Sequence, residues 1–248
     1  MAKKAEQRAY LDAMGIDVWV PRDQAVSAEA VSVDPAPQSV APVVEPPPRP
    51  VPGESADINT LDWTGLQARV STCTLCELHQ GRTQTVFGVG NQQADLMIIG
   101  EAPGAEEDRQ GEPFVGRAGQ LLTAMLKAIE FSRQDVYIAN ILKCRPPNNR
   151  DPRPEEAALC SQYLKRQIEL IQPKLILAVG RIAAQRLLQT DMSLAKMRGQ
   201  LHLYPLTNTP LIVTYHPAYL LRTPSDKRKA WQDLIFARQT LGNLGQAG

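Results

Sequence analysis

Short apolar segments alternate with longer amphipathic ones from about residue 57 onward. The apolar segments are nearly continuous and have the length of strands: Leu96–Gly100, Val136–Leu142, Leu175–Gly180 and Leu211–Tyr215. Helical spacing of apolar residues predicts helices at 118–129, after Pro154, at 182–188 and at 229–240. Strands that are apolar on both faces and separated by helices indicate a mainly parallel sheet. We therefore expect an α/β fold with helices covering both faces of the sheet.

Polar side chains follow three of these predicted strands. Glu101 comes directly after the first strand, Asn140 lies late in the second, and His216 follows the last. Open parallel sheets bind ligands at the carboxyl ends of their strands. The pattern therefore predicts a ligand site at this edge of the sheet.

The segment before residue 57 has a different pattern. Residues 5–20 hold Tyr10, Leu11, Met14, Ile16 and Trp19 in a short amphipathic stretch, and nine of the chain's 20 prolines lie between Pro21 and Pro52. Proline removes backbone donors and favours extended conformations. We expect a docking peptide at 1–20, a disordered linker at 21–56 and a folded domain at 57–248. The alternative is that the peptide packs back on its own domain.

The charge differs between the N-terminal segment and the predicted domain. The 248 residues include 27 Lys or Arg and 26 Asp or Glu, which excludes a strongly basic nucleic-acid wrapper. Residues 1–56 carry five basic and eight acidic residues, whereas 57–248 carry 22 and 18, so the domain is mildly basic. The chain lacks a secretory signal and any apolar run of membrane-spanning length. We expect a cytosolic protein that does not contact membranes.

Four cysteines provide the clearest chemical signal. Cys73 and Cys76 form a close C-x2-C pair, whereas Cys144 and Cys160 lie much later in the chain and form a loose C-x15-C pair. A reducing compartment disfavours disulfides. Zinc sites usually use two close pairs, so a loose second pair favours an iron–sulfur cluster over zinc, with four unrelated thiols as a third interpretation.

Five motifs together carry a family resemblance. They are C-x2-C at Cys73–Cys76, RTQTVFGVGN at Arg82–Asn91, GEAPGAEEDRQGEPFVGRAGQLL at Gly100–Leu122, VYIANILKCRPPNNR at Val136–Arg150 and HPAYLLR at His216–Arg222. With these motifs, residues 65–241 resemble the family-4 uracil-DNA glycosylases. The resemblance implies a three-layer α/β/α sandwich, a 4Fe-4S cluster on all four cysteines and excision of uracil from DNA.

The resemblance also assigns roles in base recognition. A glycosylase takes its base out of the stack and reads it in a pocket. Phe114 matches the family's stacking aromatic, although a loop Phe is by default a core residue. Asn140 matches the residue that reads uracil, because a fixed amide distinguishes uracil from cytosine. An Asn in a strand more commonly satisfies a neighbouring backbone group.

Three residues are candidates for catalysis. His216 resembles the histidine that donates to the uracil oxygen, and Glu101 is our candidate for stabilising the sugar cation and activating water. Ala102 stands where other branches of the superfamily carry a catalytic Asp, so the assignment of Glu101 is open. Glu107 resembles a second pocket acid, which excludes the thymine methyl; the alternative is a solvated charge.

For contact with DNA, Leu220, Leu221 and Arg222 resemble a loop that inserts into the minor groove. Phosphate contacts are expected from basic residues, which are otherwise solvated surface: Lys143, Arg145, Arg150, Arg153, Lys227, Arg228 and Lys229.

The N-terminal peptide carries a second, shorter resemblance. Leu11, Met14-Gly15-Ile16, Trp19 and Arg22 are similar to the N-terminal segment of the psi subunit of bacterial DNA polymerase III, which implies that residues 8–22 dock on the chi subunit. Two hypotheses follow: a monomeric uracil-DNA glycosylase tethered to the replication machinery, or a psi-like adaptor whose domain binds DNA without excision.

Overall fold

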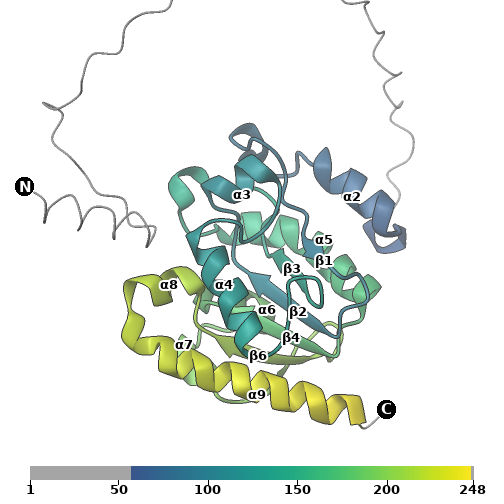
Figure 1. The fold of residues 1–248 in the computed structure, drawn as a ribbon. Helices are drawn as coiled ribbons and strands as arrows, with labels where there is room; N and C mark the ends of the chain where they lie inside the picture. The colour runs from purple at the N-terminus through teal and green to yellow at the C-terminus, as the bar shows by residue number, and fades with distance from the viewer. Residues whose placement is uncertain (1–56, 247–248) are drawn as a thin grey trace, which may run out of the picture. The chain divides into compact units, whose positions relative to one another are not determined.

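The computed structural model describes residues 57–246. Within this range six strands form one sheet in the order β1-β3-β2-β4-β6-β5 (Figure 1). Strands β2, β3, β4 and β6 run parallel, and β1 and β5 pair antiparallel at the edges. The strands are β1 Val89–Gly90, β2 Leu96–Gly100, β3 Tyr137–Asn140, β4 Leu175–Val179, β5 His202–Leu203 and β6 Pro210–Thr214. The mainly parallel sheet is confirmed. The sequence pattern missed the short edge strands β1 and β5 because they are too short to show periodicity.

The helices confirm the predicted segments and add short ones. They are α2 Trp63–Ser71, α3 Ala105–Gln110, α4 Arg117–Ala128, α5 Pro154–Ile171, α6 Arg181–Leu188, α7 Leu194–Met197, α8 Pro217–Arg222 and α9 Lys227–Gln246. Helix α5 begins with Pro at its first position, where a missing N–H has no partner to lose. Helix α9 begins slightly before its predicted start and continues to Gln246.

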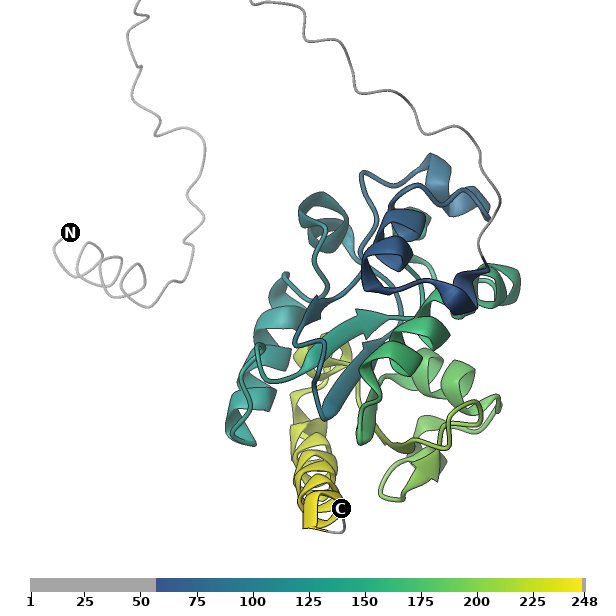
Figure 2. The same ribbon diagram turned by 90° about the vertical axis from the view of Figure 1, so that its right-hand side faces the viewer.

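Alternate residues of each strand pack against different helix layers. Met97 and Ile99 of β2 belong to the core formed with α2, α5 and α6, whereas Leu96 and Ile98 belong to the core formed with α4, α8 and α9. Figure 2 shows α4 and α9 on one side of the sheet and α2 and α5 on the other. The described residues therefore form the expected three-layer α/β/α sandwich, whose central strands are buried on both faces.

The parallel strands end together at one edge of the sheet. β2 ends at Gly100 and β3 at Asn140, and these two residues are partners in the ladder. The chain leaves β3 earlier than predicted, but Ile141 N–H still donates to Gly100 O (3.0 Å). The segments that follow these strands are therefore held side by side. Among the described residues, no helix is both long and apolar enough to cross a bilayer.

Candidate functional site

A pocket lies at the carboxyl edge of the sheet, with about 1000 Å³ of empty volume that is partly open to solvent. It brings together all residues that the sequence selected for base recognition and catalysis, with one residue of the predicted DNA-inserting loop: Glu101, Glu107, Phe114, Asn140, His216 and Arg222. The remaining lining residues are Ala102, Pro103, Gly104, Ala118, Pro146, Asn149, Arg150 and Ala218. A pocket of this size and mixed polarity suits a small organic ligand, such as a nucleobase with its sugar.

Asn140 carries an unsatisfied acceptor in this pocket. The residue is 2% exposed, and its side-chain Oδ1 has no hydrogen-bond partner among the described residues. Gly100 lies against it, since a Cβ added there would clash with this oxygen. A buried acceptor without a partner is unfavourable unless a ligand supplies the donor. The Oδ1 atom of Asn140 therefore does not satisfy a neighbouring backbone group within the described part of the chain, which disfavours the alternative interpretation of this residue.

Phe114 forms an aromatic wall beside the amide. It has a left-handed φ of 56° and is 6% exposed. The Arg133 guanidinium donates to the carbonyls of Phe114 (3.1 Å) and Pro113 (2.8 Å) and so holds this turn. The Phe114 ring lies 5.7 Å from the His216 ring at 33°. Arg133 is a supporting residue that the sequence did not reveal, because nothing in its local pattern points to a turn so much earlier in the chain.

His216 is a neutral hydrogen-bond donor. It precedes α8, and its Nδ1 accepts the Ala218 backbone N–H at 3.1 Å, so the proton of the neutral ring is on Nε2. Burial lowers the pKa of His216 to about 4, and the Arg222 charge acts in the same direction. The ring can therefore donate from Nε2 without carrying a positive charge at neutral pH.

Glu101 follows β2 directly, as predicted. Burial raises its pKa to about 7, and the nearby Asp151 carboxylate acts in the same direction, whereas Arg181 lowers it. A carboxyl group that exchanges its proton near neutral pH, in a pocket, is suited to general acid or base chemistry.

Glu107 positions the loop that carries Phe114. Its Oε1 accepts the backbone N–H groups of Val115 and Gly116, both at 3.0 Å. Gly116 is also the residue that precedes α4. Glu107 thus lines the pocket as a fixed acceptor rather than as a solvated charge.

The segment predicted as a DNA-inserting loop is helix α8. Pro217 occupies its first position and His216 caps it. Leu220 is 1% exposed and belongs to the hydrophobic core, so its expected contact with DNA is corrected: the side chain has no access to the surface. Leu221 is 37% exposed and Arg222 is exposed, so these two remain available.

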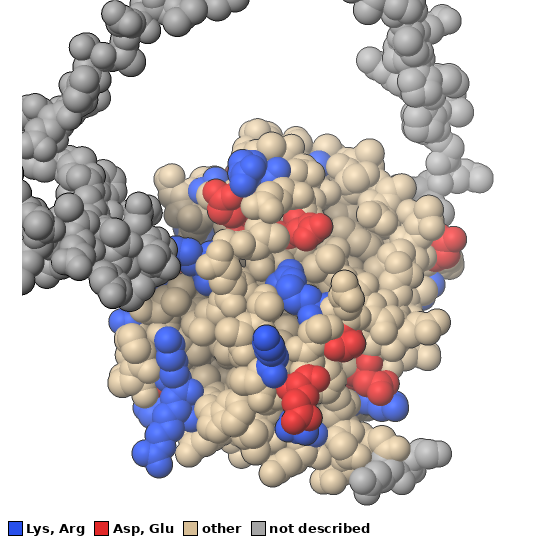
Figure 3. Space-filling model, viewed as in Figure 1, with Lys and Arg blue, Asp and Glu red and all other residues tan. Residues whose placement is uncertain are grey.

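One of the predicted phosphate contacts is also wrong. Lys143 is 1% exposed and lies inside the domain. Arg150 lines the pocket and forms an ion pair with Glu156 (2.5 Å). Figure 3 shows basic side chains over the start of α9, where the sequence reads Lys227-Arg228-Lys229.

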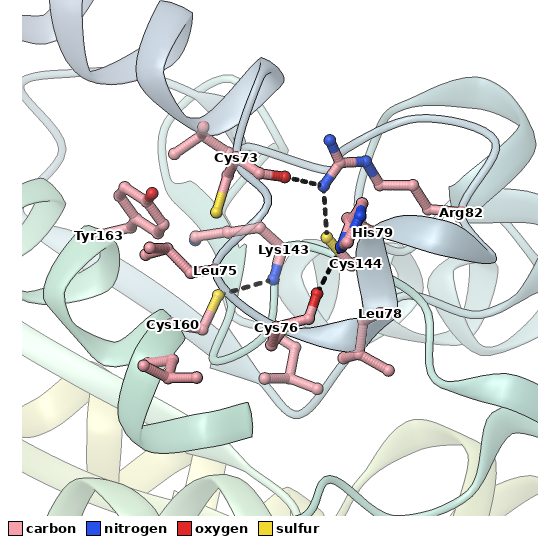
Figure 4. Close-up of a pocket in the computed structure, with 13 residues that line it drawn as sticks. Cys73, Leu75, Cys76, Leu78, His79, Arg82, Lys143, Cys144, Cys160 and Tyr163 are labelled. Atoms are coloured by element: carbon pink, nitrogen blue, oxygen red, sulfur yellow. Dashed lines mark hydrogen bonds between the residues drawn. The ribbon is translucent and has the colours of Figure 1, made fainter. Parts of the chain in front are cut away.

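A second pocket is lined by all four cysteines. Cys73 lies after α2, Cys76 precedes the 3-10 turn Glu77–Gln80, Cys144 lies in the loop after β3, and Cys160 is on α5. Figure 4 shows these cysteines around one space, with apolar side chains beside them. Three separate segments of the chain therefore converge on one set of thiols.

Two sulfur atoms accept N–H hydrogen bonds. Arg82 Nη1 donates to Cys144 Sγ (3.2 Å), and the Lys143 backbone N–H donates to Cys160 Sγ (3.3 Å). Burial raises the pKa of the Cys160 thiol to about 12. Among residues 57–246, no three His, Cys, Asp or Glu side chains converge closely enough to hold a single metal ion. The four cysteines nevertheless line the same pocket.

The chain is therefore a ligand-binding α/β sandwich, with one pocket at the carboxyl edge of its mainly parallel sheet and a second pocket lined by four cysteines. The model of the Uracil DNA glycosylase superfamily matches residues 87–235, and the chain belongs to this superfamily.

Individual relatives agree with this placement. A Type-4 uracil-DNA glycosylase of Thermotoga maritima is 48% identical over 180 residues, covering 71% of this chain and 93% of the relative. One from Archaeoglobus fulgidus is 47% identical over 161 residues, covering 62% and 81%. A Type-5 uracil-DNA glycosylase of Pyrobaculum aerophilum is 34% identical over 115 residues, covering 40% and 50%.

Proposed function

We propose that this protein is a uracil-DNA glycosylase that hydrolyses the N-glycosidic bond of uracil in DNA. Membership of the superfamily and the identity to Type-4 relatives support this activity. The structural observation that carries it is the buried Oδ1 of Asn140 in the pocket, which has no partner in the described part of the chain.

The pocket chemistry selects uracil. The Asn140 oxygen needs a donor, and uracil presents one at N3, whereas cytosine presents a lone pair there. The amide nitrogen then faces the uracil O4 acceptor. Phe114 supplies the aromatic face on which a flipped base stacks. Uracil satisfies the Asn140 acceptor, and cytosine leaves it opposed to another acceptor.

Bond cleavage uses His216 and Glu101. As the C1′–N1 bond breaks, its electron pair moves to the uracil ring and charge develops on O2. Nε2–H of His216 donates to that oxygen, and this neutral donor stabilises the anion. The Glu101 carboxylate stabilises the positive charge on the sugar and accepts a proton from the water that adds to C1′.

Release of free uracil from a uracil-containing oligonucleotide tests this function. We expect activity in the wild type, and losses of at least about 100-fold in Glu101→Ala, Asn140→Asp and His216→Ala. Lys174 is exposed and directly precedes β4, at the edge of the sheet away from the pocket. Lys174→Met therefore serves as the control and should retain activity. A cluster-loaded wild type that releases nothing would favour the DNA-binding adaptor instead.

We further propose that Cys73, Cys76, Cys144 and Cys160 hold a 4Fe-4S cluster. The four cysteines, from three separate segments, line one pocket, and the N–H groups of Arg82 and Lys143 suit thiolate sulfurs. When bound, the cluster supplies a cross-link between three segments. Iron and inorganic sulfide analysis tests this: we expect about four of each per chain, and loss of both in Cys160→Ser.

The remaining proposals concern partners. Leu221 and Arg222 meet the DNA beside the pocket, with phosphate contacts from exposed basic residues. The protein acts as a cytosolic monomer, and residues 8–22 recruit it to the chi subunit of DNA polymerase III. These residues lie outside the described part of the chain, so the support is the sequence motif alone.

A further inference from the structure

Lys143 is a buried cation without a carboxylate partner among the described residues. Its Nζ lies within hydrogen-bond distance of three oxygens: Phe87 O (3.2 Å), Asn140 O (3.0 Å) and Gln167 Oε1 (2.6 Å). An ammonium group has three donors, so each is used. Burial of a charge is unfavourable. A lysine in this position therefore requires a compensating interaction.

The ammonium holds the backbone of the residue that faces the pocket. Because the Asn140 Oδ1 makes no hydrogen bond within the described part of the chain, the direction of the amide depends on its backbone. Lys143 holds the Asn140 carbonyl, and Ile141 N–H, on the far side of the same peptide, donates to Gly100 O. Both polar groups of this peptide are thus fixed at the end of β3.

The same lysine contacts the cysteine pocket. Its backbone N–H donates to Cys160 Sγ, its carbonyl accepts Val86 N–H (2.8 Å), and it lines the pocket beside the four thiols (Figure 4). The loop that carries Lys143 is thus held between Cys160 on α5 and Asn140 at the end of β3.

Gln167 completes the arrangement. It is fully buried on α5, and its Nε2 donates to Phe87 O (3.0 Å) and Tyr137 OH (3.2 Å) while its Oε1 accepts from Lys143. The Gln167 amide and the Lys143 ammonium thus have hydrogen-bond partners on all sides. Through Tyr137 and Asn140, the network connects α5 to both ends of β3.

We propose that Lys143 is a positioning residue for uracil recognition, which fixes the Asn140 peptide relative to the cysteine-lined loop so that the amide keeps one orientation. The inference rests on the proposed glycosylase function. Loss of the ammonium releases the Asn140 carbonyl and lets the amide move, which weakens binding of the base more than binding of DNA.

Lys143→Met in the full-length, iron-loaded protein tests this role, with Lys174→Met as the control for removing a lysine. We expect kcat/KM for uracil release to fall by at least about tenfold, and the inhibition constant of free uracil to rise by a similar factor. Iron per chain and affinity for an undamaged oligonucleotide should stay at wild-type values, and Lys174→Met should behave as wild type. Loss of iron in proportion to activity would make the role structural and overturn the proposal.

A second pair of variants covers the case in which Lys143→Met does not fold. Gln167→Leu removes one acceptor of the ammonium, and Gln167→Glu keeps an oxygen there. Weaker uracil inhibition in Gln167→Leu, restored in Gln167→Glu, supports the proposal; wild-type inhibition in both overturns it. An active wild type with an unaffected Lys143→Met overturns this inference alone, whereas a wild type that releases no uracil overturns the proposed function as well.

Discussion

At the residue scale, Gly100 shows how closely the pocket is built. A Cβ at this position would lie 2.6 Å from Phe114 Cζ and closer still to Asn140 Oδ1. Both neighbours line the pocket, so an added methyl group would push the ring or the amide into the space for the base. The glycine is therefore required by close approach, and not by an unusual backbone angle.

Gly100→Ala should reduce kcat/KM for uracil release by at least about 100-fold, because the added methyl displaces the reading amide or the stacking ring. Gly242→Ala on α9 is the matched control, since a Cβ there would meet no described atom within 4 Å. Steady-state uracil release from the two variants decides the point. Full activity in Gly100→Ala would show that the pocket repacks.

Glu101 should set the pH dependence of the reaction. With its pKa raised to about 7, the carboxylate is lost as the pH falls below neutrality, so kcat/KM should fall about tenfold per pH unit there. His216, with its pKa lowered to about 4, stays neutral over this range and adds no break. Glu101→Gln should give a low, flat profile between about pH 5 and 8, and a profile that keeps the wild-type shape would contradict the assignment.

The burial of the Glu101 carboxyl group should also make the stability of the folded protein depend on pH. The pKa of Glu101 lies above its ordinary value of 4.5, so the folded state resists ionisation and loses stability as the pH rises from about 4.5 to 7. Glu101→Gln removes that penalty. We expect the melting temperature of this variant to exceed that of the wild type at about pH 8, by more than it does at about pH 5. A difference independent of pH would exclude this explanation.

At the element scale, a buried ion pair supports the segment that ends in His216. Arg198 donates to both carboxylate oxygens of Asp233 on α9 (2.6 and 2.7 Å), and Thr214 Oγ1 donates to the same carboxylate (2.8 Å). The Arg198 guanidinium also lies 4.5 Å from the centre of the Tyr215 ring. The residues before His216 are thus fixed against α9.

Arg198→Met should lower the free energy of unfolding by about 3 kcal/mol, because it leaves the buried Asp233 without its partner. Arg109→Met, which breaks the exposed pair with Glu106, should change it by less than about 1 kcal/mol. Denaturant unfolding at neutral pH measures both. Equal, small effects would mean that Asp233 is satisfied in another way.

At the scale of the whole molecule, the residues of both pockets lie between Val70 and Arg222, well inside the described range 57–246. A protein lacking residues 1–56 should therefore release uracil from a free oligonucleotide with unchanged kcat/KM. The comparison uses the full-length and shortened proteins on the same substrate. A large loss would show that the N-terminal segment takes part in the reaction.

The N-terminal peptide is expected to act only in recruitment. Trp19→Ala should abolish binding to the chi subunit and leave uracil release intact, because the indole is the largest apolar group of the motif. Arg49→Ala in the linker is the control and should bind normally. Calorimetric titration of chi into each protein measures this, and wild-type affinity in Trp19→Ala would refute docking through this motif.

The layers of the fold, and the edge of the sheet at which the site lies, follow from the local sequence pattern. Apolar runs such as Leu96–Gly100 and Leu175–Val179 must be buried on both faces, and this requirement can be read locally. The position of Glu101, Asn140 and His216 at the carboxyl edge of the sheet can also be read locally, because each residue follows or ends a strand. The five sequence motifs, with the cysteines between them, indicate the family.

The local pattern does not reveal which side chains support the site and which are exposed. Lys143 and Leu220 look like surface residues in the sequence, yet both are buried. Arg133 and Gln167 act on segments far away in the chain. Burial and hydrogen bonding between distant segments depend on packing, which leaves no periodic signal in the sequence around any one residue.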